Sequence, residues 1–240
     1  MAYAWFVAGT DTGVGKTFIS STLLRRAAAL GFKALGMKPI AAGVDEGESY
    51  NEDTLELIAA ASHSLPSEVV TPYLLQQAIA PQIAAQNEGV CIDFQRIRDS
   101  STALVKQADV LLVEGVGGFR VPLGKNTTGK KQDSADLAVA LAMPVILVVD
   151  MRLGCQNHSL LSVEAIASRG LTLAGWVANT PHKCMPFLDE NISLLAEIIE
   201  APLLGVVPPG QSIARSVQYL RLPGEEQMVA HGNADASHIS

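Results

Sequence analysis

Residues 9–17, with the sequence GTDTGVGKT, restrict the possible folds of this chain more than any other segment. They follow an apolar run, residues 3–8, and precede residues 18–30, whose apolar side chains recur at helical spacing. A strand, a glycine-rich loop and a helix in this order are typical of a phosphate-binding loop, because backbone N–H groups at a helix N-terminus can surround dense negative charge. In such a loop Lys16 supplies a mobile cation, and the Thr17 hydroxyl can bind Mg²⁺.

The loop departs from the strict pattern in one respect. That pattern has four residues between its two glycines, whereas five separate Gly9 from Gly15 and position 10 is Thr. A turn between strand and helix that binds no ligand is the alternative. The GKT run after an apolar strand favours nucleotide binding, and Gly13 and Gly15 allow phosphates to approach the backbone closely.

Composition and charge narrow the possible functions. Of the 240 residues, 48% are hydrophobic and 17% are charged, which indicates a globular chain with a substantial core. The net charge of −7 disfavours a nucleic-acid partner, which would need a basic face. The longest apolar run, residues 138–149, contains Pro144 and is too short to cross a bilayer, so no membrane partner is expected.

The location is expected to be cytoplasmic. Residues 1–8 lack the basic segment of a secretory signal and run directly into the glycine-rich loop. The three cysteines, Cys91, Cys155 and Cys184, are odd in number and lack the spacing of metal ligands. A reducing compartment is the simplest interpretation of this pattern.

Apolar runs alternate with helical patterns along the whole chain. This order predicts an α/β fold, a single-domain P-loop NTPase-like parallel sheet of about seven strands with helices on both faces. We expect residues 1–222 to form this domain. The proline-containing residues 66–81 are expected to run irregularly over its surface, and the small, polar tail, residues 223–240, to be disordered.

Polar residues stand where several predicted strands end, and ligands of open α/β sheets bind beyond these ends. Glu114 closes a strand of Val and Leu, where a buried carboxylate is costly unless a cation faces it. Mg²⁺ on nucleotide phosphates would be such a cation; the alternative is an acid that only marks the strand end. Lys38 ends another strand before Pro39, and both a solvated and a functional lysine fit that position.

Three further residues have a structural interpretation beside the functional one. Asp53 lies near a helix start, where an Asp is usually a cap or a partner of the helix dipole. Asn157 lies at the start of a helix whose N–H groups could bind a carboxylate, but an N-cap fits equally well. Asn179 follows a strand and could hydrogen-bond a base edge or simply start a turn.

Together, five segments of the chain resemble the ATP-dependent dethiobiotin synthetase family. They occur in the family's order over nearly the whole chain, to about Pro209, and only their combination is specific. The matching segments are GTDTGVGKT (9–17), KPIAAG (38–43), VEGVGG (113–118), PVILVV (144–149) with LGCQNH (153–158), and AGWVAN (174–179).

The resemblance implies a homodimeric ligase that uses ATP and Mg²⁺ to close a cyclic urea on 7,8-diaminopelargonate. One amine takes up CO₂, supplied as bicarbonate, to form a carbamate. The carbamate attacks the γ-phosphate of ATP, and the second amine then displaces phosphate. Such chemistry depends on positioning and charge stabilisation, so cations and backbone amides should matter more than acid–base groups.

The resemblance also implies roles for individual residues. Lys38 and Lys16 would be catalytic, and Lys38 would neutralise the carbamate and the γ-phosphate as they approach. Thr17, Asp53 and Glu114 would hold Mg²⁺. The residues implied in ATP binding are Gly13, Val14, Gly15, Lys16, Thr17, Phe18, Asp53, Glu114, Gly115, Val116, Gly117, Asn179, Thr180, Pro208, Pro209 and Gly210. Those implied in substrate binding are Thr12, Lys38, Ala42, Gly118, Leu153, Gly154, Cys155 and Asn157, the last four on a loop expected to reach across the dimer.

The chain departs from the family at four positions on the substrate side. The family often has a hydroxyl residue where this chain has Ala42. It has proline, serine and histidine where this chain has Ala78, Ala80 and Gln82. The substrate-side wall is therefore expected to differ from that of the family, whereas the nucleotide side is not.

Three other functions share parts of this pattern. A dimeric regulatory or partitioning-type ATPase would carry a lysine near the start of the loop, where this chain has Asp11. An amidotransferase-type ligase usually has a further glutaminase domain, for which the chain has no room. A nucleotide-binding module without catalysis does not explain Lys38 together with Glu114.

Overall fold

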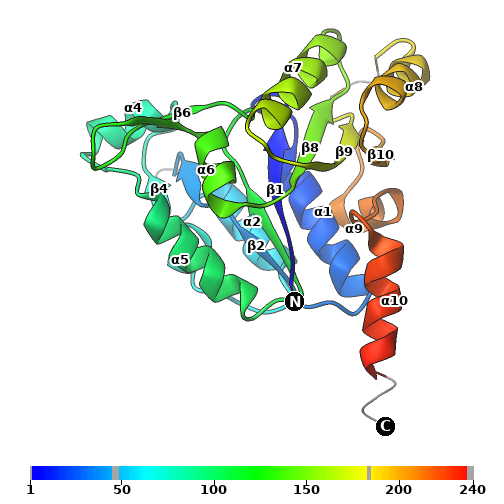
Figure 1. Cartoon of the computed structure of the whole chain (residues 1–240), viewed down its shortest axis with the longest axis horizontal. Coiled ribbons are helices and arrows are strands. Elements are labelled where there is room, and N and C mark those ends of the chain that lie inside the picture. Colours follow the sequence, from blue (N-terminus) through cyan, green and yellow to red (C-terminus); the bar gives the residue numbers. More distant parts are fainter. Residues whose placement is uncertain (1, 45–48, 183–184, 237–240) are drawn as a thin grey trace.

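The computed structural model describes residues 2–44, 49–182 and 185–236. Its centre is a parallel sheet of six strands (Figure 1). This confirms the predicted parallel α/β fold, although the main sheet has fewer strands than the roughly seven expected. In the order in which they lie side by side, the strands are β10 (Leu203–Val207), β9 (Leu173–Asn179), β8 (Val145–Asp150), β1 (Tyr3–Gly9), β5 (Val110–Glu114) and β2 (Ala34–Met37).

Four short strands pair outside this sheet. β3 (Ile40–Ala42) and β4 (Tyr73–Leu75) form a parallel pair. β6 (Pro122–Lys125) and β7 (Lys131–Asp133) form an antiparallel pair. Because β3 follows β2 and β6 follows β5 along the chain, both pairs extend from the edge of the sheet where its strands end.

Helices cover both faces of the main sheet. Side chains of α1, α2 and α10 pack on one face, and those of α5, α6, α7 and α8 on the other. None of the helices in the described part is long and apolar enough to cross a membrane. The α-helices are α1 (Lys16–Ala29), α2 (Glu52–Ala60), α3 (Ser67–Val70), α4 (Pro81–Asn87), α5 (Phe94–Val105), α6 (Ser134–Leu141), α7 (Cys155–Ser168), α8 (Leu188–Ile198), α9 (Ile213–Ser216) and α10 (Glu225–Ala236), with a 3₁₀ helix η1 (Val217–Tyr219).

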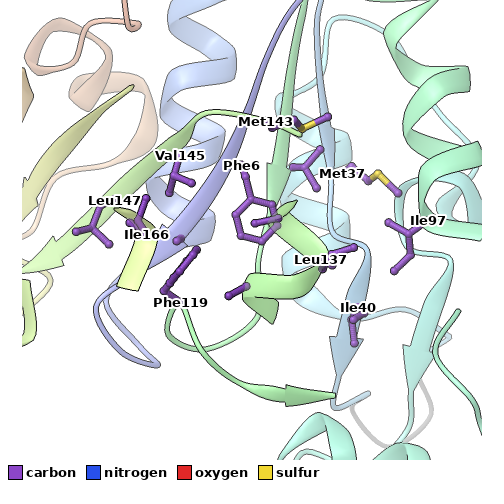
Figure 2. Packing of buried hydrophobic residues seen from close by; sticks show 14 of the residues in the cluster. Phe6, Met37, Ile40, Ile97, Phe119, Leu137, Met143, Val145, Leu147 and Ile166 are labelled. Atoms are coloured by element: carbon purple, nitrogen blue, oxygen red, sulfur yellow. The ribbon is translucent and has the colours of Figure 1, made fainter. Parts of the chain in front are cut away.

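The central strands are buried on both sides, which explains their uninterrupted apolar runs. Successive side chains of a strand point to opposite faces, so β1 contributes Phe6 and Ala8 to one core and Trp5 and Val7 to the other. Figure 2 shows the first of these cores, with Phe6 at its centre. Full burial of one such large apolar side chain stabilises the fold by about 1.5–3 kcal/mol. The two cores thereby hold β1, and the loop that follows it, in the middle of the sheet.

Residues 66–81 are more ordered than the sequence predicts. They contain α3 and β4, and the side chains of Val70, Tyr73 and Leu75 are buried. The expectation of an irregular surface segment is therefore wrong for residues 67–75, whereas residues 76–80 are irregular and exposed as expected. The prolines in this segment are visible locally, whereas the pairing of β4 with β3 joins parts of the chain far apart in sequence.

The expected disorder of the tail is wrong for the residues of α10. Met228 is buried, and the Glu225 carboxylate accepts a hydrogen bond from Nε of Arg26 on α1 at 3.1 Å. Figure 1 shows α10 (red) alongside α1 (blue). The tail is helical because α1 offers it an apolar contact and a cation, neither of which is visible in the tail itself. Residues 237–240 lie outside the described part of the chain.

Replacing Met228 with Ala tests whether α10 is part of the core. We expect a loss of about 2–3 kcal/mol in the free energy of unfolding, because the change removes buried methylenes and leaves a cavity. Urea denaturation measures this loss. Glu226→Ala is the matched control on the exposed side of the same helix and should cost less than about 0.5 kcal/mol. Equal effects of the two changes would contradict the packing of α10.

Candidate functional site

The glycine-rich loop lies where the strand connections diverge. β1 lies between β8 and β5. After β1 the chain continues to β2 at one edge of the sheet, whereas β8, β9 and β10 lie on the other side of β1. Ligands of open α/β sheets bind at such a point, beyond the carboxyl ends of the strands. The loop joins β1 to α1 there, and Gly13 and Gly15 have φ angles of 74° and 85°, which glycine adopts without strain.

Thr17, the second residue of α1, faces two carboxylates from other elements. Its Oγ1 lies 2.8 Å from Oδ1 of Asp53 and 2.8 Å from Oε1 of Glu114. One hydroxyl proton can be donated to only one of these oxygens at a time. The second carboxylate oxygen of Glu114 is buried without a hydrogen-bond partner. A hydroxyl beside two carboxylates, one of which has an oxygen without a partner, fits a divalent cation.

Lys38 completes this cluster from the end of β2. Its Nζ lies 2.8 Å from Oδ2 of Asp53 and 2.5 Å from Oε1 of Glu114, and its side chain is 5% exposed. The interpretation of Lys38 as a solvated lysine is therefore wrong, and Glu114 does more than mark a strand end. Removing one partner of such a buried ion pair typically costs about 3–5 kcal/mol, because the other charge stays unpaired.

Asp53 reaches the cluster from the first turn of α2. The N-cap of that helix is Asn51, whose side chain accepts a hydrogen bond from the N–H of Asp53 at 3.1 Å. The cap role that the sequence leaves open for Asp53 therefore belongs to Asn51. The Asp53 carboxylate instead points at Thr17 and Lys38.

Burial acts on both lysines of the site, with opposite results. Burial, aided by the charge of Lys38, lowers the pKa of Lys16 to about 8. Burial would also lower the pKa of Lys38, but the carboxylates of Glu114 and Asp53 outweigh it and raise this pKa above its usual value. Burial would raise the pKa of Asp53, yet Lys38 outweighs it and holds this pKa below its usual range. At neutral pH the site thus holds a fixed cation beside a carboxylate.

These side chains form the charged wall of a cavity of about 690 Å³. The opposite wall is apolar. Among the predicted site residues, those that line the cavity are Thr12, Gly13, Gly15, Lys16, Thr17, Lys38, Ala42, Asp53, Glu114, Val116 and Gly117; Ala78, Ile79, Ala80, Pro81 and Val121 complete it. The other predicted site residues do not line this cavity.

Asn179 holds the glycine-rich loop through a side-chain hydrogen bond. Its side chain is buried, and Nδ2 donates a hydrogen bond to the carbonyl of Val14 at 2.8 Å. Asn179 is the last residue of β9, so it does not start a turn there. Thr180 follows, and its hydroxyl donates to the carbonyl of Val207, which brings residues 208–210 to the same edge of the sheet. The residues implied in base binding therefore converge, although they do not line the 690 Å³ cavity.

Residues 153–157 lie apart from the cavity within one chain. Leu153 is 91% exposed, whereas Cys155 is buried in the core. The N-cap of α7 is Gly154 and Asn157 is the helix's third residue, so the interpretation of Asn157 as the N-cap is wrong. Asn157 is exposed to solvent. Gly118 faces a neighbouring groove that also contains Thr12.

The sequence interpretation misses several residues of the site. Arg152 forms ion pairs with Asp150 at 2.9 Å and with Asp11 of the loop at 2.8 Å. Asp11 lies inside the recognised motif, but nothing in the sequence indicates its partner. Ile79 and Val121 cannot be recognised from the sequence, because apolar residues of a cavity wall look like ordinary core residues. Pro81, at the first position of α4, indicates only that a helix begins close to Ile79.

The fold has close counterparts among solved structures. The MinC:MinD cell division protein complex of Aquifex aeolicus contains a chain with a TM-score of 0.55 and 14% identity, covering 95% of this chain and 93% of that one. The cell division protein FtsY of Thermotoga maritima gives a TM-score of 0.54 and 14% identity, covering 95% and 67%. At this identity the likeness concerns the fold alone. Fold and loop geometry together define a protein of the P-loop NTPase class.

Sequence comparison narrows the class to a family. Residues 4–216 match a family model described as an AAA domain. The ATP-dependent dethiobiotin synthetase BioD of Aromatoleum aromaticum is 55% identical over 225 residues, which cover 92% of this chain and 98% of the relative. The protein of the same name from a Janthinobacterium species is 49% identical over 209 residues, covering 85% and 86%. The chain belongs to the family of ATP-dependent dethiobiotin synthetases.

Gly15→Ala tests whether the loop needs its glycine for conformation or for space. A Cβ at Gly15 would lie 2.4 Å from Nδ2 of Asn179, so we expect nucleotide affinity to fall about 100-fold, a loss of about 2.7 kcal/mol. Isothermal titration with a non-hydrolysable ATP analogue measures the loss.

Gly31→Ala is the matched control for this change. Gly31, just after α1, has a φ of 89°, but its Cβ would meet nothing within 4 Å. The control therefore carries the left-handed backbone strain, about 1–2 kcal/mol, without the clash. Nucleotide affinity should be unchanged in Gly31→Ala. If both changes weaken nucleotide binding alike, the contact between Gly15 and Asn179 is not what matters.

Proposed function

We propose that this protein uses ATP to close the ureido ring of dethiobiotin on 7,8-diaminopelargonate and CO₂. The observation that carries the proposal is the position of Lys38, a buried cation at the wall of the cavity that also contains the phosphate loop. A protein that only binds or hydrolyses a nucleotide has no evident need for a second buried lysine beside Lys16. Membership in the dethiobiotin synthetase family supports the same reaction.

The reaction has three steps, in which the chain mainly positions groups and neutralises charge. The nitrogen of one amine attacks CO₂ and loses a proton, which gives a carbamate. A carbamate oxygen attacks the γ-phosphorus of ATP, and ADP leaves. The second amine attacks the carbonyl carbon of the resulting anhydride, phosphate leaves, and the ring closes. Two anions must meet in the second step, and fixed cations in a site that excludes water stabilise such an encounter.

Lys16 and Lys38 are proposed to supply these cations. Lys16, in the loop, would accompany the β- and γ-phosphates, and its pKa of about 8 leaves it mostly protonated at neutral pH. Lys38 comes from the end of β2 and not from the loop, and the carbamate would lie beside it. Because the neighbouring carboxylates raise its pKa, Lys38 stays charged without being free to act as a base. Its role would therefore be electrostatic.

Thr17, Asp53 and Glu114 are proposed to hold Mg²⁺ together with the nucleotide phosphates. The buried, unpartnered oxygen of Glu114 fits this assignment. Within the described residues, no group of three or more Asp, Glu, His or Cys side chains is arranged so that it could hold a metal ion by itself. Mg²⁺ does not need such a cage, because it commonly binds one or two carboxylates plus phosphate oxygens. When bound, the ion would offset phosphate charge.

The substrate carboxylate is proposed to bind a second copy of the chain, at residues 153–157. These residues do not line the cavity of their own chain. Leu153 and Leu161 are 91% and 56% exposed, as expected for side chains that a partner covers. A homodimer would bring this loop to its neighbour's cavity, whereas a monomeric mass in solution would contradict this assignment.

The remaining nucleotide contacts and the location belong to the same proposal. Asn179, Thr180 and residues 208–210 are proposed to contact the adenine, because they meet at the strand edge next to the loop. A cytoplasmic location is proposed because the reaction needs ATP. Cys91 and Cys155 form no disulfide, which agrees with a reducing compartment.

Phosphate release in the presence of ATP, Mg²⁺ and bicarbonate tests the function. We expect release only when 7,8-diaminopelargonate is added, because the carbamate is the nucleophile. A coupled phosphate assay measures the rate, and mass spectrometry identifies dethiobiotin as the product. Hydrolysis that is independent of the diamine and stimulated by a protein or DNA would instead support a switch ATPase.

Lys16→Ala and Lys38→Ala separate the two cations. We expect each to lower turnover about 10²–10³-fold, the usual cost of removing one transition-state charge contact. Only Lys16→Ala should also weaken binding of a non-hydrolysable ATP analogue. Lys106→Ala, an exposed lysine on another element, should leave both quantities unchanged. Because Lys38→Ala leaves two carboxylates unpaired, circular dichroism must first show that the variant is folded. Equal loss of nucleotide affinity in both variants would remove Lys38 from the substrate side.

A further inference from the structure

Arg152 connects the phosphate loop to the end of a neighbouring strand. Its Nη2 lies 2.8 Å from Oδ2 of Asp11, and its Nε lies 2.9 Å from Oδ2 of Asp150. Asp150 is the last residue of β8, and its side chain is 7% exposed, so this carboxylate needs a cation. The other Asp11 oxygen accepts the backbone N–H of Thr12 at 2.7 Å. The guanidinium of Arg152 therefore pairs both with the buried Asp150 and with Asp11 in the glycine-rich loop.

The backbone of Arg152 also shapes the segment that starts α7. The N–H of Arg152 donates to the carbonyl of Asp150 at 2.9 Å, and the carbonyl of Arg152 accepts the N–H of Cys155 at 2.9 Å. These two bonds close the turn that carries Leu153 and Gly154 into the helix. Arg152 thus belongs to both segments that the reaction would use: the phosphate loop through its side chain, and residues 153–157 through its main chain.

Asp11 makes such a partner necessary. A carboxylate within a loop that holds polyphosphate repels its ligand unless its charge is offset. Lys16 offsets this charge only from a distance, since its Nζ contacts the carbonyl oxygen of Asp11 at 3.3 Å and not the carboxylate. Arg152 is the cation that the described residues place on that carboxylate.

We propose that Arg152 is a positioning residue for the ring-closing reaction: it holds Asp11 and Asp150 in one fork and so fixes the phosphate loop relative to residues 153–157. The role in substrate binding rests on the function proposed above; the role at the phosphate loop does not. The fork geometry is essential, because an arginine can pair with two carboxylates from two of its nitrogens, whereas a lysine offers a single point charge.

Arg152→Gln and Arg152→Lys test this proposal. Arg152→Gln should weaken binding of a non-hydrolysable ATP analogue with Mg²⁺ about tenfold and raise the KM for the diamine about tenfold, a size usual for lost charge-assisted hydrogen bonds. Arg152→Lys keeps the charge but not the fork, so the KM for the diamine should stay raised. Full recovery of both constants by lysine would overturn the proposal, since general attraction of anions would then suffice.

Asp11→Asn identifies the partner through a double-mutant cycle. If Arg152 acts through Asp11, the variant carrying Asp11→Asn and Arg152→Gln should bind the analogue no more weakly than Arg152→Gln alone. Effects that simply add would overturn the link. This cycle uses the nucleotide analogue without diamine, so it decides the role of Arg152 at the loop even if the wild-type protein shows no diamine-dependent turnover, which would reject the proposed function instead.

Arg26→Gln is the matched control for a general effect on stability. Arg26 also forms an ion pair with an acid, Glu225, although a less exposed one, and it lies at the far end of α1 from the loop. The control should change neither the affinity for the analogue nor the KM for the diamine by more than about twofold, within ordinary variation for a distant surface change. Thermal unfolding of all variants should shift alike. If Arg26→Gln reproduces the effects of Arg152→Gln, the role of Arg152 is structural.

Discussion

The site is organised around a lysine buried between two carboxylates. Lys38, Asp53 and Glu114 come from β2, α2 and β5, and each would be costly to bury alone. Their attraction offsets that cost only while the three elements keep their places, so the cluster depends on the apolar sheet around it. Thr17 joins the cluster from α1. The phosphate loop, the cation and the carboxylates are therefore held by one set of contacts.

The cavity combines this charged wall with an apolar one. Ala42, Ala78 and Ala80, together with Ile79, offer methyl and methylene groups to this cavity. A ligand with a charged, reacting end and an alkyl chain would match both walls.

The fold by itself does not define the chemistry. The FtsY chain and the chain from the MinC:MinD complex share this architecture at 14% identity, with TM-scores of 0.54 and 0.55. In this chain the strand ends carry Lys38 beside Glu114, and Asp11 pairs with Arg152. One fold can serve many reactions, so the chemistry has to be argued from such side chains and not from the architecture.

The sequence alone determined the features that depend on local pattern. These are the phosphate loop, the parallel sheet with buried strands, and the strand-end positions of Lys38 and Glu114, because alternation of apolar runs and glycine spacing are local signals. The folded structure was needed for the features that distant contacts make. It gave α10 its place through Met228 and Arg26, brought the Asp53 carboxylate to Thr17, and paired Arg152 with Asp11, 141 residues away in the chain. An ion pair leaves no pattern in a sequence, since either partner looks like any surface charge until the chain has folded.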